Sequence, residues 1–345
     1  MSNFKKAVCA TLAVVLLALL LSAGLVAYYY HRGVYTYEDA KERKELAGQL
    51  DLLVCGASAG QVSINPDTLD DVLGTRSYNL GSPRLLLHAR TYLLRKELER
   101  NPIKTVLLEV SLDVLSQDDR QTDYARGEAR MLTRLDSLSE RIDYCKTYLP
   151  PENFMQLYAV SVRYGTESLL ARLTGAVGKI KPSIRGYREN APQDMTLGPE
   201  QIETLRDSQS LPQPHAENLA ELQKMADLCR EHGARVIVLV TPTPFSCHWK
   251  IANEEEAFGV LRDFCSRNGC LLLNFDLDRE RAQYLSDAAS FSDEYHLSAA
   301  GAHAFSPRLA EILKRVLAGE DVSARFFDSY AEMEAASPYA VIGRP

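Results

Sequence analysis

Near its N-terminus the chain carries an uncharged apolar run from Ala7 to Tyr30, directly preceded by Lys5 and Lys6. At about 1.5 Å per residue, a helix over this run is roughly 36 Å long, whereas the hydrocarbon core of a bilayer is about 30 Å thick. A buried helix of a globular domain can be equally apolar, but the N-terminal position behind two lysines favours a membrane. The run therefore predicts one transmembrane helix over residues 7–30.

A cleaved signal peptide is the alternative, because Leu25-Val26-Ala27 resembles a loose small-residue cleavage site. The apolar cores of signal peptides usually run about 7–15 residues, which is shorter than this run. Three tyrosines, Tyr28 to Tyr30, close the run and are typical of an interfacial aromatic belt. We therefore expect an uncleaved anchor.

The orientation of this anchor does not follow from a simple count of basic residues, since Arg32, Lys41, Arg43 and Lys44 follow the run. Long domains translocate largely regardless of such charges. We expect residues 1–6 to be a cytoplasmic tail and the rest of the chain to lie outside the cytoplasm, as a single-pass protein of the cell membrane.

The composition excludes several classes of protein. The 39 Lys and Arg against 46 Asp and Glu lack the basic field of a nucleic-acid binder, so no nucleic-acid partner is expected. A hydrophobic fraction of 46% excludes disorder. The 7 cysteines show no CxxC motif and no zinc-finger spacing, so we expect no metal and no cofactor. Most thiols are expected to be unpaired; only Cys265 and Cys270 lie close enough in sequence to suggest a disulfide.

Beyond the anchor, short apolar runs alternate with helical patterns. Continuous apolar runs are typical of strands buried on both faces of a sheet. The alternation predicts an α/β fold: a three-layer sandwich with a central, mostly parallel five-stranded sheet. The expected strands are Asp51–Cys55, Arg76–Leu80, Thr105–Val110, Arg235–Thr241 and Cys270–Phe275, and the main helices are Pro83–Arg100, Ala216–His232, Glu254–Asn268 and Ala299–Leu317.

The domain boundaries follow from the same pattern. Residues 31–50 are charged and helix-prone and predict a stalk, residues 51–317 form the α/β domain, and residues 318–345 are a C-terminal tail. Residues 117–213 are too long for a simple crossover and predict a helical insertion, with helices around Glu128–Tyr148 and Asn153–Thr174. This insertion is either a structural appendage or dimer surface, or a lid over the site.

A serine follows the first expected strand in the sequence Gly56-Ala57-Ser58-Ala59-Gly60. Ligands bind beyond the carboxyl ends of the strands in an open α/β sheet. Small residues around Ser58 allow a tight turn that exposes the hydroxyl group. Most glycine and serine turns are only turns, and the arrangement does not match the nucleophile elbow of the α/β-hydrolases, so this motif alone is weak.

The second motif is Asp293-Glu294-Tyr295-His296, between the last strand and the final helix, which Ser298 can cap. A spacing of three residues lets Asp293 bind one imidazole nitrogen of His296 and leaves the other nitrogen facing outward. A base is oriented in this way toward a serine nucleophile. The alternative is a solvated acidic turn before a capped helix.

Together the motifs resemble the SGNH/GDSL hydrolase superfamily over roughly residues 51–317. The blocks that carry the resemblance are Gly56-Ala57-Ser58, Tyr78-Asn79-Leu80-Gly81-Ser82 and Asp293-Glu294-Tyr295-His296-Leu297-Ser298. The resemblance implies that Ser58 is the nucleophile, His296 the general base and Asp293 its orienting acid. It also implies that backbone N–H groups of Ser58 and Gly81 form an oxyanion hole.

The sequence departs from this family in two places. Ala57-Ser58 stands where the family has Asp-Ser, and Glu109-Val110-Ser111-Leu112-Asp113 replaces the third block, which normally carries Gly-x-Asn-Asp. The usual oxyanion asparagine is therefore missing, and Asn79 or Ser111 is the candidate substitute. The loss implies either reduced hydrolysis or a specialised acyl transfer.

An anchor followed by such a domain resembles bacterial envelope-modifying proteins, such as those of teichoic-acid D-alanylation and polysaccharide O-acetylation. The resemblance implies a membrane-anchored serine esterase or acyltransferase acting on acyl esters or glycans of the cell envelope, with a membrane acyl-donor protein as a possible partner. The alternative is a catalytically inactive scaffold that binds an envelope polymer or a membrane partner. A third reading is an anchored α/β domain in which the triad is accidental.

Overall fold

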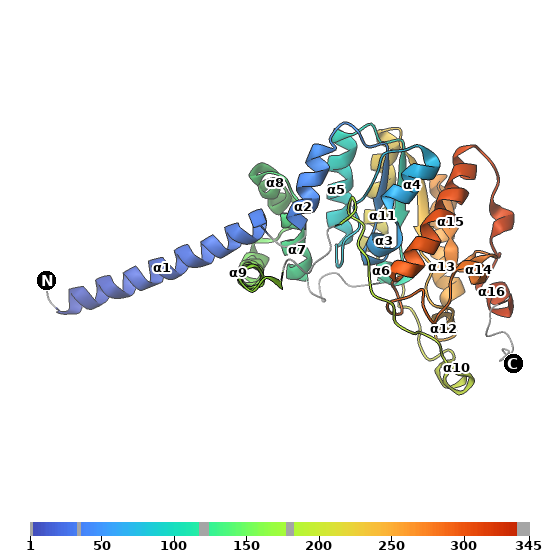
Figure 1. The fold of residues 1–345 in the computed structure, drawn as a ribbon. Helices are drawn as coiled ribbons and strands as arrows, with labels where there is room; N and C mark the ends of the chain where they lie inside the picture. The colour runs from blue at the N-terminus through green and yellow to red at the C-terminus, as the bar shows by residue number, and fades with distance from the viewer. Residues whose placement is uncertain (1–2, 33–35, 117–123, 177–182, 337–345) are drawn as a thin grey trace. The chain divides into compact units, whose positions relative to one another are not determined.

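A computed structural model describes residues 3–32, 36–116, 124–176 and 183–336 of the chain (Figure 1). It contains two compact units, one built from residues 1–45 and 123–182 and the other from residues 46–122 and 183–345. We call them the anchor unit and the sheet unit and describe each by itself. The predicted insertion 117–213 is thus divided, because residues 183–213 belong to the sheet unit. Parts of the predicted stalk, insertion and tail (residues 33–35, 117–123, 177–182 and 337–345) lie outside the described residues.

The sheet unit contains the five predicted strands, and all of them are parallel. In space their order is β2-β1-β3-β4-β5. The registers pair Leu53 with Tyr78 and with Val106, and Leu107 with Ile237. The predicted α/β class is therefore confirmed. The strands are β1 (Leu52–Cys55), β2 (Ser77–Asn79), β3 (Thr105–Glu109), β4 (Arg235–Val240) and β5 (Leu271–Asn274).

Helices cover both faces of this sheet and make it the middle of three layers (Figure 1). On one face Leu53, Val106 and Val238 pack against α5, α11 and α13. On the other face Leu52 and Ile237 pack against α4 and α15. Burial of both faces explains the uninterrupted apolar runs of the sequence. These helices are α4 (Pro66–Leu73), α5 (Leu87–Arg100), α11 (Ala216–Glu231), α13 (Glu254–Asn268) and α15 (Ala299–Leu317).

The strand order reverses beside β1. The chain leaves β1 toward β2 on one side and later returns to β3 on its other side. In open parallel sheets, ligands bind at such a reversal, beyond the carboxyl ends of the strands. The shorter elements of the sheet unit include α3 (Ser58–Ser63), α6 (Leu112–Ser116), α10 (Pro199–Leu205), α12 (Phe245–His248), η3 (Phe275–Leu277) and α14 (Arg281–Tyr284).

The predicted C-terminal tail is ordered as part of the sheet unit up to residue 336. After η4 (Ser323–Arg325), α16 (Tyr330–Ala336) packs Tyr330 and Met333 into a small core with Phe245 and Leu277. The prediction of a separate tail from residue 318 is wrong over this stretch, because these apolar side chains are buried.

The anchor unit consists of helices. They are α1 (Asn3–Arg32), α2 (Thr36–Glu45), α7 (Tyr124–Thr133), α8 (Leu138–Tyr148) and α9 (Phe154–Leu173), with the 3-10 turn η1 (Pro151–Asn153) before α9. The region expected to form one helix around residues 128–148 forms two, because a turn precedes Ser137, which caps α8. Within α2, Asp39 is buried and forms an ion pair with Arg134 at 3.6 Å, so this part of the predicted stalk packs inside the unit.

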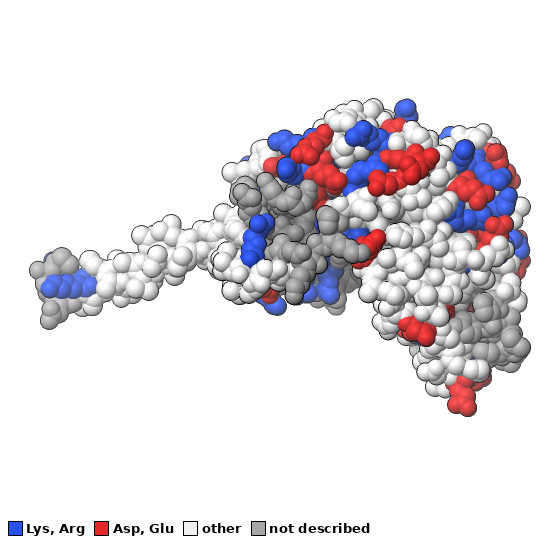
Figure 2. Space-filling view, viewed as in Figure 1, with Lys and Arg blue, Asp and Glu red and all other residues white. Residues whose placement is uncertain are grey.

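Helix α1 is long and apolar enough to cross a membrane, by length and composition, between Phe4 and Tyr30. Figure 2 shows its exposed length without charged side chains beyond a basic cluster near the N-terminus. The aromatic belt expected at its end is only partly free for lipid, since Tyr29 is buried with its ring 5.5 Å from that of Tyr164. The hydroxyl group of Tyr30 also shares a 2.6 Å hydrogen bond with Ser161 on α9.

Candidate active site

Ser58 lies at the carboxyl edge of the sheet, where it is the first residue of α3. The chain leaves β1 at Cys55 and turns through Gly56 and an extended Ala57 (φ −88°, ψ −155°). The backbone N–H of Ala57 donates a 2.8 Å hydrogen bond to Oε2 of Glu109, the last residue of β3. Neighbouring parallel strands thus hold the serine turn in place.

The glycines on either side of Ser58 leave room for the Glu109 side chain. A Cβ atom on Gly56 would lie 2.5 Å from Oε2 of Glu109, and one on Gly60 would lie 3.1 Å from the same oxygen. Contacts under about 3.0 Å do not occur between real Cβ atoms and their neighbours, so Gly56 cannot carry a side chain here. From the sequence, Glu109 was assigned no role beyond its place in the replaced third block. The signal that points to its role is a carboxylate at the end of an otherwise apolar strand.

The structure brings His296 to Ser58 across a sequence separation of more than two hundred residues. Nε2 of His296 lies 2.7 Å from Oγ of Ser58. Nδ1 of the same ring lies 2.8 Å from both carboxylate oxygens of Asp293. Since a carboxylate only accepts hydrogen bonds, Nδ1 carries the proton and Nε2 is left to accept one from the serine hydroxyl group.

A capped helix fixes the position of the imidazole ring. Ser298 is the N-cap of α15: its Oγ accepts a hydrogen bond from the N–H of Gly301 and donates one to the carbonyl of Ala289. His296 therefore lies two residues before a rigid helix start, as the sequence predicted. Its side chain is 22% exposed and that of Asp293 is 48% exposed, so the three residues form a site open to solvent.

Asn79 and Gly81, which were expected to donate hydrogen bonds to the oxyanion, are not free to do so. Asn79 is buried, and its amide donates hydrogen bonds to the carbonyls of Gly60 and Ile64, both at 2.8 Å. Its Oδ1 accepts the N–H of Gly81 at 2.9 Å. Both amide protons of Asn79 and the N–H of Gly81 are thus engaged within the protein, which corrects these two assignments. Asn79, the last residue of β2, instead ties the middle and the C-terminal end of α3 to this strand.

The N–H of Ser58 has the position expected of a donor. It belongs to the first residue of α3, and the N–H groups of a first helical turn have no acceptor inside the helix. Ser111, the other candidate, is half-buried at the start of the turn that leads into α6.

The segment of residues 183–198 runs along one border of the site. The backbone carbonyl of Asn190 accepts a 2.8 Å hydrogen bond from the N–H of Ala299, and the side-chain amide of Asn190 donates one to Oγ of Ser292 at 3.2 Å. The N–H of Arg188 donates to the carbonyl of Gln61 on α3 at 3.3 Å. The segment therefore contacts both the serine helix and the histidine loop.

Another border is formed by the chain that follows β4. Lys250 forms an ion pair with Glu294, the residue after Asp293. Tyr295, the next residue, is 51% exposed beside the triad. Phe245 and Trp249 on this chain are buried, with the guanidinium groups of Arg281 and Arg206 over their rings at 4.0 and 5.2 Å.

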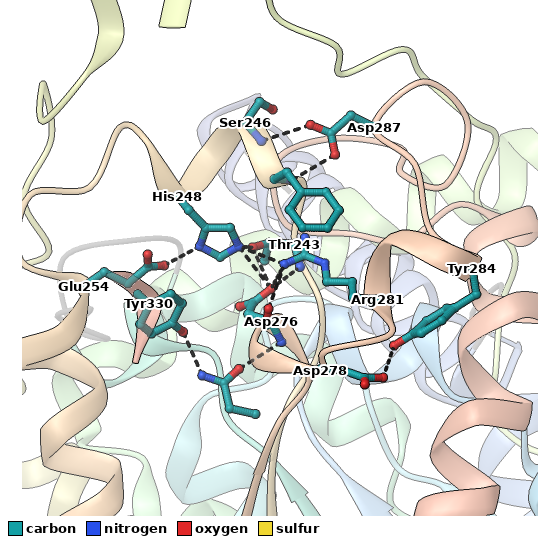
Figure 3. Close-up of polar contacts among 12 residues, drawn as sticks. Thr243, Ser246, His248, Glu254, Asp276, Asp278, Arg281, Tyr284, Asp287 and Tyr330 are labelled. Atoms are coloured by element: carbon teal, nitrogen blue, oxygen red, sulfur yellow. Dashed lines mark hydrogen bonds and ion pairs between the residues drawn. The ribbon is translucent and has the colours of Figure 1, made fainter. Parts of the chain in front are cut away.

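A second polar cluster, absent from the sequence predictions, lies in the core beneath α12 (Figure 3). Nδ1 of His248 lies 2.8 Å from Glu254, and Nε2 lies 3.3 Å from Asp276, which also pairs with Arg281 at 3.1 Å. Burial alone lowers the pKa of this imidazole, but the two carboxylates outweigh it and raise the pKa of His248 to about 10. The cluster is fully buried, so it holds α12 rather than meeting a substrate.

Among the described residues, no group of three or more His, Cys, Asp and Glu side chains has an arrangement that could hold a metal ion. All 7 cysteines, including Cys265 and Cys270, are free thiols in the structure. In comparisons with known proteins, no family model and no curated protein sequence matches the chain.

Proposed function

We propose that this chain is a membrane-anchored serine hydrolase or acyltransferase of the SGNH/GDSL type, acting on acyl esters of envelope carbohydrates or polyols. The observation that carries this proposal is the continuous hydrogen-bonded chain from Ser58 through His296 to Asp293. Its position at the carboxyl edge of a parallel sheet, beside the reversal of the strand order, is where such sheets bind ligands.

In the first half of the reaction, Oγ of Ser58 attacks the acyl carbonyl while Nε2 of His296 takes its proton. The carboxylate of Asp293 keeps the ring in the required tautomer and stabilises the imidazolium that forms. When the tetrahedral intermediate collapses, the ester C–O bond breaks and the leaving alcohol takes the proton from His296. Ser58 then carries the acyl group.

In the second half, a hydroxyl group attacks the acyl-serine and His296 again accepts the proton. Ser58 is released when the proton returns to Oγ. The N–H of Ser58 is the donor that we assign to the developing oxyanion, and each such donor typically contributes about 3–4 kcal/mol to the transition state.

We propose transfer to a sugar or polyol hydroxyl group over transfer to water. A single span through α1 and an extracytoplasmic domain would hold the site near membrane-linked donors and glycans at high effective concentration. The test supplies an activated acetyl ester with and without an oligosaccharide acceptor and follows both products. Release of free acid at a rate that no acceptor changes would favour a plain esterase.

An inactive scaffold that binds an envelope polymer is the second candidate. It is favoured by one observation: Asn79 and Gly81 have their donors engaged within the protein. A scaffold of this kind would keep the triad geometry but lack the oxyanion stabilisation that acylation of the serine requires.

A fluorophosphonate probe separates the two candidates, because it bonds covalently only to an activated serine. We expect the wild type to be labelled and Ser58→Ala to be unlabelled. Ser63→Ala is the matched control, since Ser63 is buried at the other end of the same helix. Absence of labelling in the folded wild type would favour the scaffold.

A further inference from the structure

Helix α9 of the anchor unit presents an exposed apolar stripe. At 3.6 residues per turn, its members fall within about 120° of the helix circumference. Met155 is 77% exposed at one end and Leu173 is 75% exposed at the other. The stripe contains no charged residue; its members are Met155, Tyr158, Ala159, Val162, Thr166, Leu169, Leu170 and Leu173.

The other faces of α9 are different in kind. Leu157, Ser161, Gly165 and Ser168 form the buried face within the unit. The charged residues of the exposed surface lie beside the stripe rather than in it; Arg163 and Glu167, for example, pair with each other at 2.8 Å. Large exposed apolar areas on a soluble protein mark an interaction surface. The stripe therefore requires an apolar partner.

Contacts with α1 show in which direction the stripe faces. At the edge of the stripe, the Tyr158 hydroxyl group shares a 2.6 Å hydrogen bond with Ser22. Toward the buried face, a Cβ on Gly165 would lie 2.2 Å from the carbonyl oxygen of Leu25. Farthest from the stripe, the ring of Tyr164 contacts that of Tyr29. Residues of α9 that lie closer to the stripe therefore contact residues of α1 that lie closer to its N-terminus. The stripe thus faces toward the N-terminal part of α1.

The depth of these contacts follows from the helix rise. About 20 residues cover a hydrocarbon core of about 30 Å, so a core that begins at Ala7 ends near Val26. Ser22 then lies about 6 Å inside the end of the hydrocarbon core at Val26, and the hydroxyl group of Tyr158 reaches Ser22 at this depth. Figure 1 shows α9 nearly end-on where α1 runs across the view, so α9 crosses α1 steeply instead of running beside it.

We propose that α9 is an interfacial membrane helix: it lies in the headgroup region around α1, and the stripe faces the acyl chains of the same membrane. This inference rests on the proposed crossing of the membrane by α1. Amphipathic helices in this position bury their apolar face about 5–10 Å into the headgroup and acyl boundary. The protein would then contact the bilayer through the span and through one flank of the anchor unit.

The test uses tryptophan as a depth probe in the full chain. Trp249, the single native tryptophan, is replaced by phenylalanine to remove its emission. Met155→Trp and Leu173→Trp place a probe on the stripe, whereas Gln156→Trp and Glu167→Trp place one on the exposed polar side as matched controls. Each variant is reconstituted in phosphatidylcholine vesicles with brominated acyl chains. We expect quenching at positions 155 and 173 to be several-fold stronger than at 156 and 167.

A separate measurement tests the span itself. If α1 crosses the membrane, alkaline carbonate leaves the wild-type chain in the membrane fraction. Carbonate-resistant protein with equal quenching at all four positions would overturn the interfacial helix and leave the anchor intact. Emission that is blue-shifted but unquenched at positions 155 and 173 would show that protein covers the stripe, and would also overturn the proposal. Release by carbonate would overturn the anchor and with it this inference.

Discussion

At the scale of single residues, the turn that carries Ser58 depends on the side chain of Glu109. The carboxylate is buried and accepts the N–H of Ala57, while its atoms occupy the space beside Gly56 and Gly60. A serine that follows a strand can act as a nucleophile only if its backbone turn is fixed, so that its hydroxyl group stays in place. Glu109 therefore acts as a positioning residue for the proposed nucleophile.

Substitution of Gly56 by alanine tests this contact. A Cβ 2.7 Å from the Cβ of Glu109 forces the turn apart, and overpacking of this kind typically costs about 1–3 kcal/mol. We expect lower stability and weaker labelling of Ser58 by a fluorophosphonate. Gly259→Ala is the control, because nothing lies within 4 Å of the position and alanine favours the helix α13 by about 0.5–1 kcal/mol. Equal effects of both variants would contradict the assignment.

The triad is expected to act as a unit. Substitution of either Ser58 or His296 by alanine should reduce kcat by several orders of magnitude. In a serine protease with the same triad, the corresponding substitutions reduce kcat by about 10⁶-fold. The double variant should lose little more, because either change alone already stops the proton transfer. The measurement is ester hydrolysis by the two single variants and the double variant. Losses that multiply in the double variant would show that the two residues act separately.

At the scale of elements, the buried cluster around His248 joins the loop after β4 to α13 and to the end of β5. Its imidazole faces Glu254, Asp276, Arg281 and Thr243. The same loop continues to Lys250, whose ion pair with Glu294 reaches the turn that carries Asp293. The cluster thus supports one border of the proposed site from below.

This cluster makes stability depend on pH. The pKa of His248 is raised from 6.5 to about 10 in the folded chain, so its contribution is complete below pH 6.5 and is lost as the pH rises toward 10. One such group changes the free energy of unfolding by at most about 1.4 kcal/mol per pH unit. We expect the urea midpoint, followed by Trp249 fluorescence, to fall between pH 6.5 and 8.5. His248→Gln should be less stable and should show a flatter profile; parallel profiles would refute the role of His248.

At the scale of the whole molecule, the chain combines a unit that contains the apolar helix with a unit that contains the sheet. The division does not follow the order of the sequence, because residues 123–182 join the N-terminal helices and residues 183–336 return to the sheet. The unit with the candidate span is therefore larger than a single helix and contains α7, α8 and α9.

The orientation of this molecule is a prediction that intact cells can test. With the tail inside and the sheet unit outside, protease added to intact cells should digest the domain. Protein that is degraded only after permeabilisation would instead place the domain in the cytoplasm. An intact cytoplasmic marker in the same sample controls for leakage.

Patterns that repeat along the chain were sufficient to predict much of this protein. The apolar run of α1, the five strands and the cap of α15 depend on local composition and periodicity, and all are present in the structure. The approach of His296 to Ser58 was predicted only through the resemblance to the SGNH/GDSL superfamily, and the two side chains do meet in the structure. The catalytic role of these residues stays a prediction.

Only the tertiary structure decided which groups are already engaged. Asn79 was a plausible oxyanion donor by type, but its amide is bonded to two carbonyls that lie far from it in sequence. In the same way, the charges of His248 and Glu254 resemble those of any polar surface until their burial is known. The same holds for whole segments, because the division of the predicted insertion 117–213 between two units depends on which helices pack together. Periodicity is a property of neighbours along the chain, whereas hydrogen-bond partners and burial depend on residues that only folding brings together.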